Sequence, residues 1–226
     1  FCRTFPIKEV FVGIFTEIPL KDLADIGRGA VTKPVDIQER TATELTPIRY
    51  LTVSDIQDNY ILPTLRCLKN IEEREIKYCL KENDIVVAKM GQPKIGLVGD
   101  IGENKIILSQ NLYVLRPDMA KINPVYLRAF FESPLGMERL AKAYVKSTIP
   151  TLPIRNLECL AVPVPTPETE LSEEEKMMAS LELQNSFAEL YKKSETKEFE
   201  YKDLAEQEKE RRVALFEEFM NNSARN

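Results

Sequence analysis

The chain has 226 residues, of which 43% are hydrophobic and 30% charged, and its formal net charge is −5. This length suits one good-sized core or a core with an extension, and no apolar run approaches the roughly 18 residues of a membrane-spanning helix. Histidine is absent, which excludes Ser-His-Asp and Cys-His nucleophiles and every histidine-ligated metal site. Most classes of hydrolase are thereby excluded, and we expect neither a metal nor a membrane partner.

The N-terminus and the cysteines indicate the compartment. No basic region with an apolar run and a small-residue cleavage site opens the sequence, so we expect a cytoplasmic protein. Cys2, Cys67, Cys79 and Cys159 lie far apart without a C-x-x-C pair, and we expect them to be reduced and structural.

The negative charge is concentrated at the end of the chain. Residues 168–226 hold 16 acids and 9 bases, whereas residues 1–167 hold 20 acids and 22 bases. A mildly basic body is compatible with a surface that faces phosphate groups.

Residues 5–117 are predicted to form mostly short strands. Segments rich in β-branched and aromatic residues are separated by Gly, Asn, Asp or Pro, namely EVFVGIF, IRYLTV, DIVVAKM, IGLVGDI, KIILSQ and NLYVLRP. Between them, we expect PLKDLADIGRG to form a short helix ending at Gly27 or Gly29, and SDIQDNYI to form another brief helical turn.

Helices follow the strands. Apolar residues recur at helical spacing in residues 123–145, and Ser133-Pro134 separates two helices there. Residues 168–222 contain no Gly or Pro, and a helix of about 50 residues, about 75 Å long, is expected to project from the body. We predict an α+β fold, with a β-rich mixed domain and a helix pair in residues 1–166 and a long, projecting, coiled-coil-like helix in residues 167–226.

The long helix carries a stripe of residues spaced alternately by four and three. Its apolar members are Leu183, Phe187, Leu190, Tyr201, Leu204 and Leu215, and its polar members are Ser194, Lys197, Glu208 and Arg211. Such a stripe predicts pairing with another helix, in a second copy of the chain or in another segment. The alternative is a helix that lies partly on its own domain and has a solvated end.

Two motifs suggest chemistry. The glycines of GQPKIGLVGDIG fit neither phosphate-binding pattern, and glycines between strands serve turns and bulges. Asp84 with Glu103 and Lys105 resembles the Asp…Glu-x-Lys spacing of metal-dependent nucleases. The two segments that hold this triplet, ENDIV and GENKI, are equally typical of polar turns that bound strands.

Basic and amide side chains form a more coherent group. Lys89, Gln92 and Lys94 fall in one predicted turn, and Ser109, Gln110 and Asn111 fall where another strand begins. Lysine binds phosphates, and Gln or Asn pairs with adenine edges in the major groove. Residues 139–155 add four bases and no acid, which predicts a positive edge.

The order of the segments resembles the target-recognition domain of type I restriction-modification specificity subunits. The residues that carry the resemblance are PLKDLADIGRG, RYLTVSDI, LKENDIVVAKMGQPKIGLVGDI, LSQNLYVLRP, INPVYLRAFFESPLGMERL and KSTIPTLPIRNLECLAVPVPTP, followed by a long helix. The likeness runs from about Ile18 to Asn222.

The resemblance implies a DNA reader without an active site of its own and without a cofactor. In this family each recognition domain contacts one half of a split double-stranded target. The long helix is a spacer that pairs antiparallel with another helix and docks adenine methylase subunits that use S-adenosylmethionine, and through them motor and nuclease subunits. Its DNA-facing loops correspond to residues 27–33, 89–94, 109–111 and 146–151. The implied contact residues are Arg28, Lys33, Lys89, Gln92, Lys94, Ser109, Gln110, Asn111, Lys146, Ser147, Thr148 and Thr151.

The sequence departs from the family pattern because it has one recognition domain and one long helix instead of two of each. We expect either a half-subunit that dimerises through its helix or a piece of a longer chain, such as the C-terminal reader of a single-chain adenine-N6 methyltransferase, and a first residue other than Met favours a piece. A different class of protein, an assembly scaffold that binds no DNA, is the remaining alternative.

Overall fold

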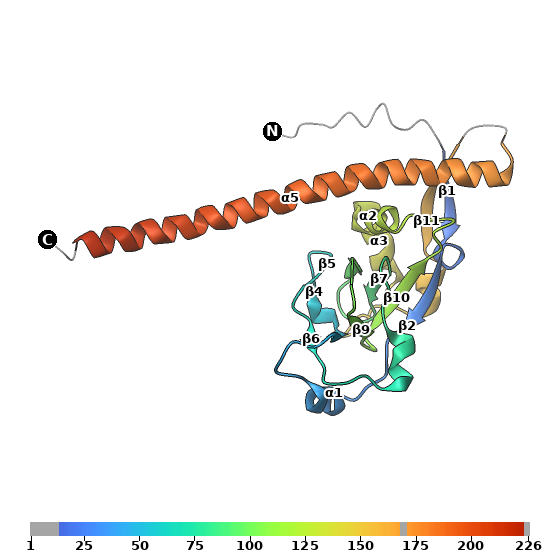
Figure 1. The fold of residues 1–226 in the computed structure, drawn as a ribbon. Coiled ribbons are helices and arrows are strands. Elements are labelled where there is room, and N and C mark those ends of the chain that lie inside the picture. The colour runs from blue at the N-terminus through green and yellow to red at the C-terminus, as the bar shows by residue number, and fades with distance from the viewer. Residues whose placement is uncertain (1–13, 168–170, 224–226) are drawn as a thin grey trace. The chain divides into compact units, whose positions relative to one another are not determined.

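The computed structural model describes residues 14–167 and 171–223 (Figure 1). The chain divides into two compact units, Phe1–Asn185 and Ser186–Asn226. The first unit contains the described strands and the beginning of the long helix, and the second contains the rest of that helix. The domain boundary expected after residue 166 stays a prediction.

The fold is α+β, as predicted from the sequence. The helices are α1 (Pro34–Arg40), α2 (Pro124–Glu132), α3 (Pro134–Ala143), α4 (Ile154–Glu158) and α5 (Glu173–Ser223), with 3-10 turns at Leu20–Asp22, Val53–Asp55 and Glu73–Tyr78. The strands are β1 (Ile14–Pro19), β2 (Ala24–Arg28), β3 (Ile48–Leu51), β4 (Ile56–Gln57), β5 (Tyr60–Ile61), β6 (Arg66–Cys67), β7 (Ile85–Ala88), β8 (Ile95–Leu97), β9 (Lys105–Leu108), β10 (Leu112–Pro117) and β11 (Ala161–Thr166).

The central sheet is antiparallel, in the order β2-β10-β7-β8. Its two faces belong to different cores because side chains alternate along a strand. On β7, Ile85 and Val87 pack with α2 and α3, while Val86 and Ala88 pack with Ile106 and other residues beneath the sheet. A strand buried on both faces needs the continuous apolar run from which it was predicted.

A second sheet, β6-β3-β9, forms the next layer. Strands β3 and β9 are parallel, with Tyr50 opposite Ile107. Ile107 faces a third, smaller core with Ile37 of α1 and Leu68. The first unit is therefore layered as helix pair, central sheet, second sheet and α1.

The helix pair α2–α3 confirms the prediction for residues 123–145. The Asn123 side chain accepts hydrogen bonds from the backbone of Val125 (2.8 Å) and Tyr126 (3.2 Å) and so caps α2. Ser133 lies between the helices, where its hydroxyl accepts from the Gly136 N–H (3.1 Å) and donates to the Phe130 carbonyl (2.6 Å). The turn is tight because these local bonds satisfy the helix ends.

The predictions of a short helix in residues 19–29 and of a helical turn in residues 54–61 were wrong over most of each segment. In residues 19–29 only Leu20–Asp22 turns, and Ala24–Arg28 forms β2, because pairing with β10 supplies its backbone hydrogen bonds. In residues 54–61 a 3-10 turn ends at Asp55 and the β4–β5 hairpin follows. Asp58 (φ 48°) and Asn59 (φ 63°) form its two-residue turn, which requires left-handed backbone.

The strand expected from EVFVGIF is described only from Ile14 onward, as β1, and residues 9–13 lie outside the described residues. Figure 1 shows β1 beside β11, and the two pair antiparallel with Phe15 opposite Pro165. Within the described sheets β11 pairs with β1 alone, which is an arrangement that its prolines allow. Of the cysteines, Cys67, Cys79 and Cys159 are free thiols, and Cys2 is not described.

Helix α5 spans 51 residues. It begins with a capping box in which the Ser172 hydroxyl accepts from the Glu175 N–H (3.3 Å) and the Glu175 carboxylate accepts from the Ser172 N–H (2.9 Å). The expected start at residue 168 falls among residues that the structure does not describe. In the described part of the chain, no helix combines the length and the apolar character needed to cross a bilayer.

Candidate nucleic-acid interface

Four segments expected to face DNA lie at the same edge of the central sheet. β2 and β7 end at this edge, and β10 and β8 begin there, because neighbouring strands run antiparallel. The segments are residues 27–33, 89–94, 109–111 and 146–151, and we call them the loop row. They contain five bases and no acid.

Backbone hydrogen bonds join the first segments of the loop row. The Gly29 N–H donates to the Leu112 carbonyl (3.2 Å), and the Ala30 N–H donates to the Leu108 carbonyl (2.7 Å). The Lys89 N–H donates to the Asn111 carbonyl (2.8 Å). Residues 27–33, 109–111 and 89–94 are thus adjacent through main-chain contacts, which do not depend on side-chain identity.

The last segment joins the row through the turn after β7. The Gly91 N–H donates to the Pro150 carbonyl (2.9 Å), and the Leu152 N–H donates to the Lys89 carbonyl (2.9 Å). Thr151 also forms isolated bridges with Met90 and Val145. Residues 146–151 are therefore bound to the body on the side of the 89–94 turn and are not a free linker.

Two buried tyrosines donate hydrogen bonds to the backbone next to the 89–94 and 146–151 segments. The Tyr113 hydroxyl donates to the Leu152 carbonyl (3.0 Å), and the Tyr144 hydroxyl donates to the Ala88 carbonyl. Burial raises the pKa of both phenols, so both stay protonated donors.

The side chains of the loop row differ in their access to solvent. Half-buried are Lys89, Lys94, Gln110 and Thr151; exposed are Arg28, Lys33, Gln92, Asn111, Lys146, Ser147 and Thr148. In the described part of the chain no carboxylate forms an ion pair with Arg28, Lys33, Lys89 or Lys146. Their charges are available to an anionic partner.

Two predicted contact residues point inward instead. The Lys94 ammonium donates to the Ile56 carbonyl (2.8 Å) and more weakly to the Val53 carbonyl (3.4 Å), so it holds the β4–β5 hairpin against the turn. Ser109 is only 5% exposed, and its hydroxyl has no hydrogen-bond partner among the described residues. These positions support the loop row and do not lie on its surface.

Glycine is required at two places in the row. A Cβ on Gly29 would lie 1.9 Å from the carbonyl oxygen of Ser109, far inside van der Waals contact. Gly91 has a φ of +83°, which side-chain-bearing residues rarely adopt. The close approach at Gly29 brings two segments together, and Gly91 allows the 89–94 turn to reach Pro150.

A hollow of about 320 Å³ lies between the 89–94 turn and the loop before Thr151. Its lining residues are Gly91, Gln92, Pro93, Ala141, Tyr144, Lys146 and Pro150. The two prolines and the tyrosine offer apolar walls, and the amide and the ammonium are its polar groups. The loop row therefore has a concave part beside exposed polar side chains.

The loop row also contains exposed apolar residues that were not predicted from the sequence as contact residues. Val31 is 81% exposed and Ile149 is 56% exposed. The signal that could have revealed them is an apolar residue inside an otherwise polar loop that lacks a core-facing period.

The predicted positive edge in residues 139–155 is partly neutralised. The Arg139 guanidinium donates to both carboxylate oxygens of Glu17 (2.5 and 2.8 Å) and to the Ala161 carbonyl (2.7 Å). Its hydrogen bond holds the pKa of Glu17 below the ordinary value. Arg139 thus connects α3 to the β1–β11 ribbon, and Lys142 pairs with Glu138.

The nuclease-like triplet does not form a metal site of the expected kind. Asp84 is 1% exposed. Its carboxylate accepts two bonds from the Arg116 guanidinium (2.9 and 2.8 Å) and one from the Lys81 N–H (2.8 Å). These three donors occupy the oxygens that a cation would need, so Asp84 is a structural residue.

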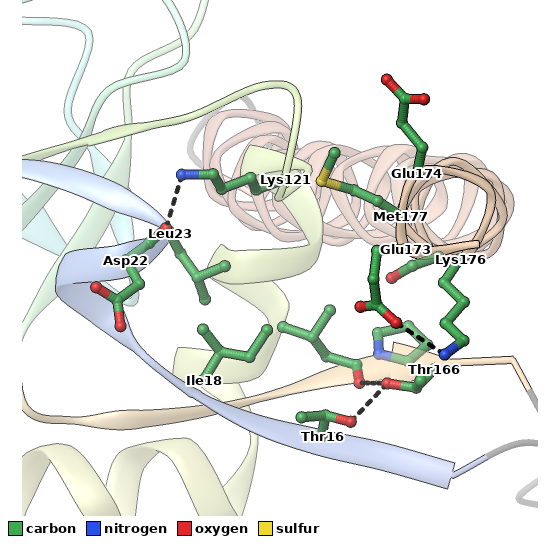
Figure 2. Close-up of a pocket in the computed structure, with 13 residues that line it drawn as sticks. Thr16, Ile18, Asp22, Leu23, Lys121, Thr166, Glu173, Glu174, Lys176 and Met177 are labelled. Atoms are coloured by element: carbon green, nitrogen blue, oxygen red, sulfur yellow. Dashed lines mark hydrogen bonds and ion pairs between the residues drawn. The ribbon is translucent and has the colours of Figure 1, made fainter.

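Another hollow, of about 480 Å³, lies between the β1–β11 ribbon and the first turns of α5 (Figure 2). Its apolar floor includes Ile18, Leu23 and Met177. Figure 2 shows its two lysines in local contacts: Lys121 donates to the Asp22 carbonyl (3.2 Å), and Lys176 pairs with Glu173 (2.9 Å). Because its lysines are engaged locally, the loop row is the stronger candidate site.

Comparisons with known proteins address the fold. No protein-family model and no curated protein matches the sequence. A chain in a solved structure of a type I restriction-modification system aligns with 15% identity, a TM-score of 0.50, and coverage of 87% of this chain and 45% of that chain. The chain has a fold found in type I restriction-modification systems.

Further solved structures align less closely. The S subunit of a type I system from M. genitalium aligns with 15% identity and a TM-score of 0.48 over 78% of this chain and 40% of that chain. The HsdS subunit from Thermoanaerobacter tengcongensis aligns with 15% identity and a TM-score of 0.44 over 84% and 42%. The chain spans less than half the length of these proteins.

Proposed function

We propose that this chain is a sequence-specific DNA-binding specificity subunit, or half-subunit, of a type I restriction-modification system. The observation that carries the proposal is the loop row, in which four segments that hold five bases and no acid meet at one edge of the sheet. The fold shared with a chain of such a system supports it.

The exposed side chains of the loop row fit the chemistry of duplex DNA. Arg28, Lys33 and Lys146 bind phosphates, and the amides of Gln92 and Asn111 pair with base edges in the major groove. Exposed apolar side chains of the row contact thymine methyl groups. The row reads one half of a split target, and a second reader, in another copy or another chain, reads the other half.

The chain has no catalytic role in this proposal. Histidine is absent, and the nuclease-like Asp84 is occupied by Arg116. Adenine methylation is carried out by partner methylase subunits that use S-adenosylmethionine, and cleavage by motor and nuclease subunits that join through them. The stripe of α5 pairs with the second reader and contributes to docking these partners.

Removing two bases from the loop row is expected to weaken DNA binding. With Lys89→Ala and Lys146→Ala together, affinity for a mixed-sequence duplex should fall roughly tenfold per lysine, and the slope of log affinity against log salt should shrink by about 2, because each phosphate contact contributes about 0.9. Fluorescence anisotropy over a salt series measures both quantities.

The matched control is the pair Lys21→Ala and Lys81→Ala, two exposed lysines that precede the strands at the opposite edge of the central sheet. The control should bind as the unmodified chain does. An equal loss in both double variants, or salt-independent binding by the unmodified chain, contradicts the proposal.

Adding charge to the α5 stripe is expected to abolish pairing. With Phe187→Asp and Leu204→Asp, self-association or partner docking should be lost, because a carboxylate buried in a helix seam has no partner there. Val213→Asp, at an exposed apolar residue off the stripe, is the control. Sedimentation velocity is the measurement, and equal sedimentation of all three chains at high concentration rejects the pairing role.

A further inference from the structure

The edge strand of the central sheet has free main-chain donors beside the loop row. β2 is the first strand in the order β2-β10-β7-β8, so within this sheet it pairs on one side only. The Gly29 N–H donates to the Leu112 carbonyl (3.2 Å), and the N–H groups of successive residues in an antiparallel strand point to opposite sides. The N–H groups of Ile26 and Arg28 therefore point away from β10, and among the described residues they have no hydrogen-bond partner.

Two hollows lie between this part of the chain and the 3-10 turn Glu73–Tyr78. The larger, of about 350 Å³, is lined by Arg28 of the loop row and by Lys77 of the turn, among others. The smaller, of about 170 Å³, is lined by residues 30–32 of the loop row and again by Lys77. The turn is therefore a neighbour of the loop row, although its residues were not predicted to face DNA.

Lys77 is a cation that both hollows share. Its side chain is exposed, and its ammonium lies 5.1 Å from the centre of the Tyr78 ring, which is within the range of a cation–π contact. No carboxylate of the described residues forms an ion pair with it. The ring steadies the lysine without neutralising its charge.

The acidic side chains at the hollows have cationic neighbours of their own. Glu75, in the smaller hollow, forms an ion pair with Arg40 (2.7 Å). Asp25, in the larger hollow, lies opposite Arg116 in the register of β2 and β10. The ammonium of Lys77 therefore remains available to an anion.

The width of the central sheet matches the groove that the loop row would face. Three strand spacings separate β2 from β8, and at about 4.8 Å each they make the row about 14 Å across. The major groove of B-DNA is about 12 Å wide. When the strand order runs across the groove, the middle of the row lies over base edges and each end lies over a sugar–phosphate strand. Lys77 is beside the β2 end, and Lys146 lines the hollow at the 89–94 turn, which leads into β8.

We infer that Lys77 and the outward N–H of Arg28 bind a phosphate of one DNA strand, while Lys146 binds a phosphate of the complementary strand across the major groove. Lysine side chains and backbone N–H groups both donate to phosphate oxygens in protein–DNA complexes. The inference rests on the proposed function. It adds a contact residue outside the loop row and the orientation of the duplex relative to the strands.

Removing Lys77 tests the first contact in the full-length chain. With Lys77→Ala, the slope of log affinity against log salt should shrink by about 0.9, which is the contribution of one phosphate contact. Affinity should fall by the same factor for a duplex selected from a random pool and for a scrambled duplex, because a phosphate contact carries no sequence information. Lys77→Arg keeps the charge and should keep the slope.

The matched control is Lys105→Ala. Lys105 is an exposed lysine at the start of β9, the end of that strand remote from the loop row. The control should keep the salt slope of the unmodified chain. Circular dichroism should be the same for every variant, so that a changed slope is not a sign of misfolding.

Neutral linkages in the DNA locate each phosphate. Single methylphosphonates are placed in turn along both strands of the selected duplex, and fluorescence anisotropy measures the affinity of the unmodified chain, Lys77→Ala and Lys146→Ala. At the position that Lys77 contacts, the methylphosphonate should weaken binding by the unmodified chain severalfold and leave binding by Lys77→Ala unchanged. The corresponding position for Lys146→Ala should lie on the complementary strand.

Several outcomes overturn the inference. An unchanged slope in Lys77→Ala removes Lys77 from the interface, and positions on one and the same strand reject the orientation across the groove. A smaller slope that no single methylphosphonate reproduces indicates that the hollow binds free phosphate and not DNA. In each of these cases the unmodified chain still binds DNA in a salt-dependent way and the proposed function stands, whereas salt-independent binding by the unmodified chain refutes the proposed function itself.

Discussion

Asp84→Ala is expected to destabilise the fold by about 3 kcal/mol, which is the low end of the cost of removing one partner from a buried ion pair. Asp84 is 1% exposed and receives two bonds from Arg116 and one from the backbone of Lys81. The low end applies because the Arg116 side chain is 39% exposed and water can still solvate it. A guanidinium keeps its charge in proteins, so the charge left behind does not neutralise itself.

Glu103→Ala is the matched control for this prediction. Glu103 belongs to the same nuclease-like triplet, but its side chain is exposed, so its removal should change the free energy of unfolding by less than about 0.5 kcal/mol. Urea unfolding followed by circular dichroism compares the two variants. Equal stability of both variants contradicts the structural role of Asp84, and magnesium-dependent DNA cleavage lost in both revives the nuclease hypothesis.

Gly29→Ala is expected to lower stability by about 2 kcal/mol and DNA affinity by at least about tenfold. The added methyl group would lie 1.9 Å from the Ser109 carbonyl oxygen. Because the Cβ is fixed directly to the backbone of residue 29 and the oxygen belongs to the backbone of Ser109, neither can move by a side-chain rotation. The end of β2 must therefore separate from residues 108–112, and the bonds from Gly29 and Ala30 weaken. Two of the four segments of the loop row then move.

Gly99→Ala is the control, because no atom lies within 4 Å of a Cβ built there and its backbone is not left-handed. This substitution should leave the free energy of unfolding unchanged or slightly higher, because alanine restricts the unfolded chain more than glycine does and fits the native backbone here. The measurements are urea unfolding and anisotropy with the same duplex. Full DNA affinity in a destabilised Gly29→Ala protein would show that this part of the loop row does not contact DNA.

Much of the fold could be predicted because its signals are local. The run IVVA of β7 is apolar at every position, and Asn123 and Ser133 are side chains that cap helices. Such patterns depend on residues a few positions apart. The prediction of a helix in residues 19–29 was wrong because β2 forms by pairing with β10, which is far away in sequence. The prediction for residues 54–61 was wrong because Asp58 and Asn59 adopt left-handed backbone and make a hairpin turn.

The candidate site was predictable as a set of segments and not as a set of side chains. The order of the segments indicated residues 89–94 and 146–151, but their adjacency follows from the bond between Gly91 and Pro150. Within the segments, Lys94 turns inward to carbonyl groups while Lys146 is exposed. A lysine in a loop has the same local sequence signal in both cases, so only the surrounding backbone distinguishes them.

The sequence by itself determined the properties that depend on composition and short periods: the segregation of charge, the lack of histidine, the β-rich body, the helix pair and the long helix with its four-and-three stripe. Tertiary structure alone decided which groups meet. It placed Arg116 on Asp84, Glu17 on Arg139 and the Ser109 carbonyl against Gly29. The physical reason is that hydrogen bonds, ion pairs and close contacts depend on distances between residues that lie tens of positions apart, and folding, not local propensity, sets those distances.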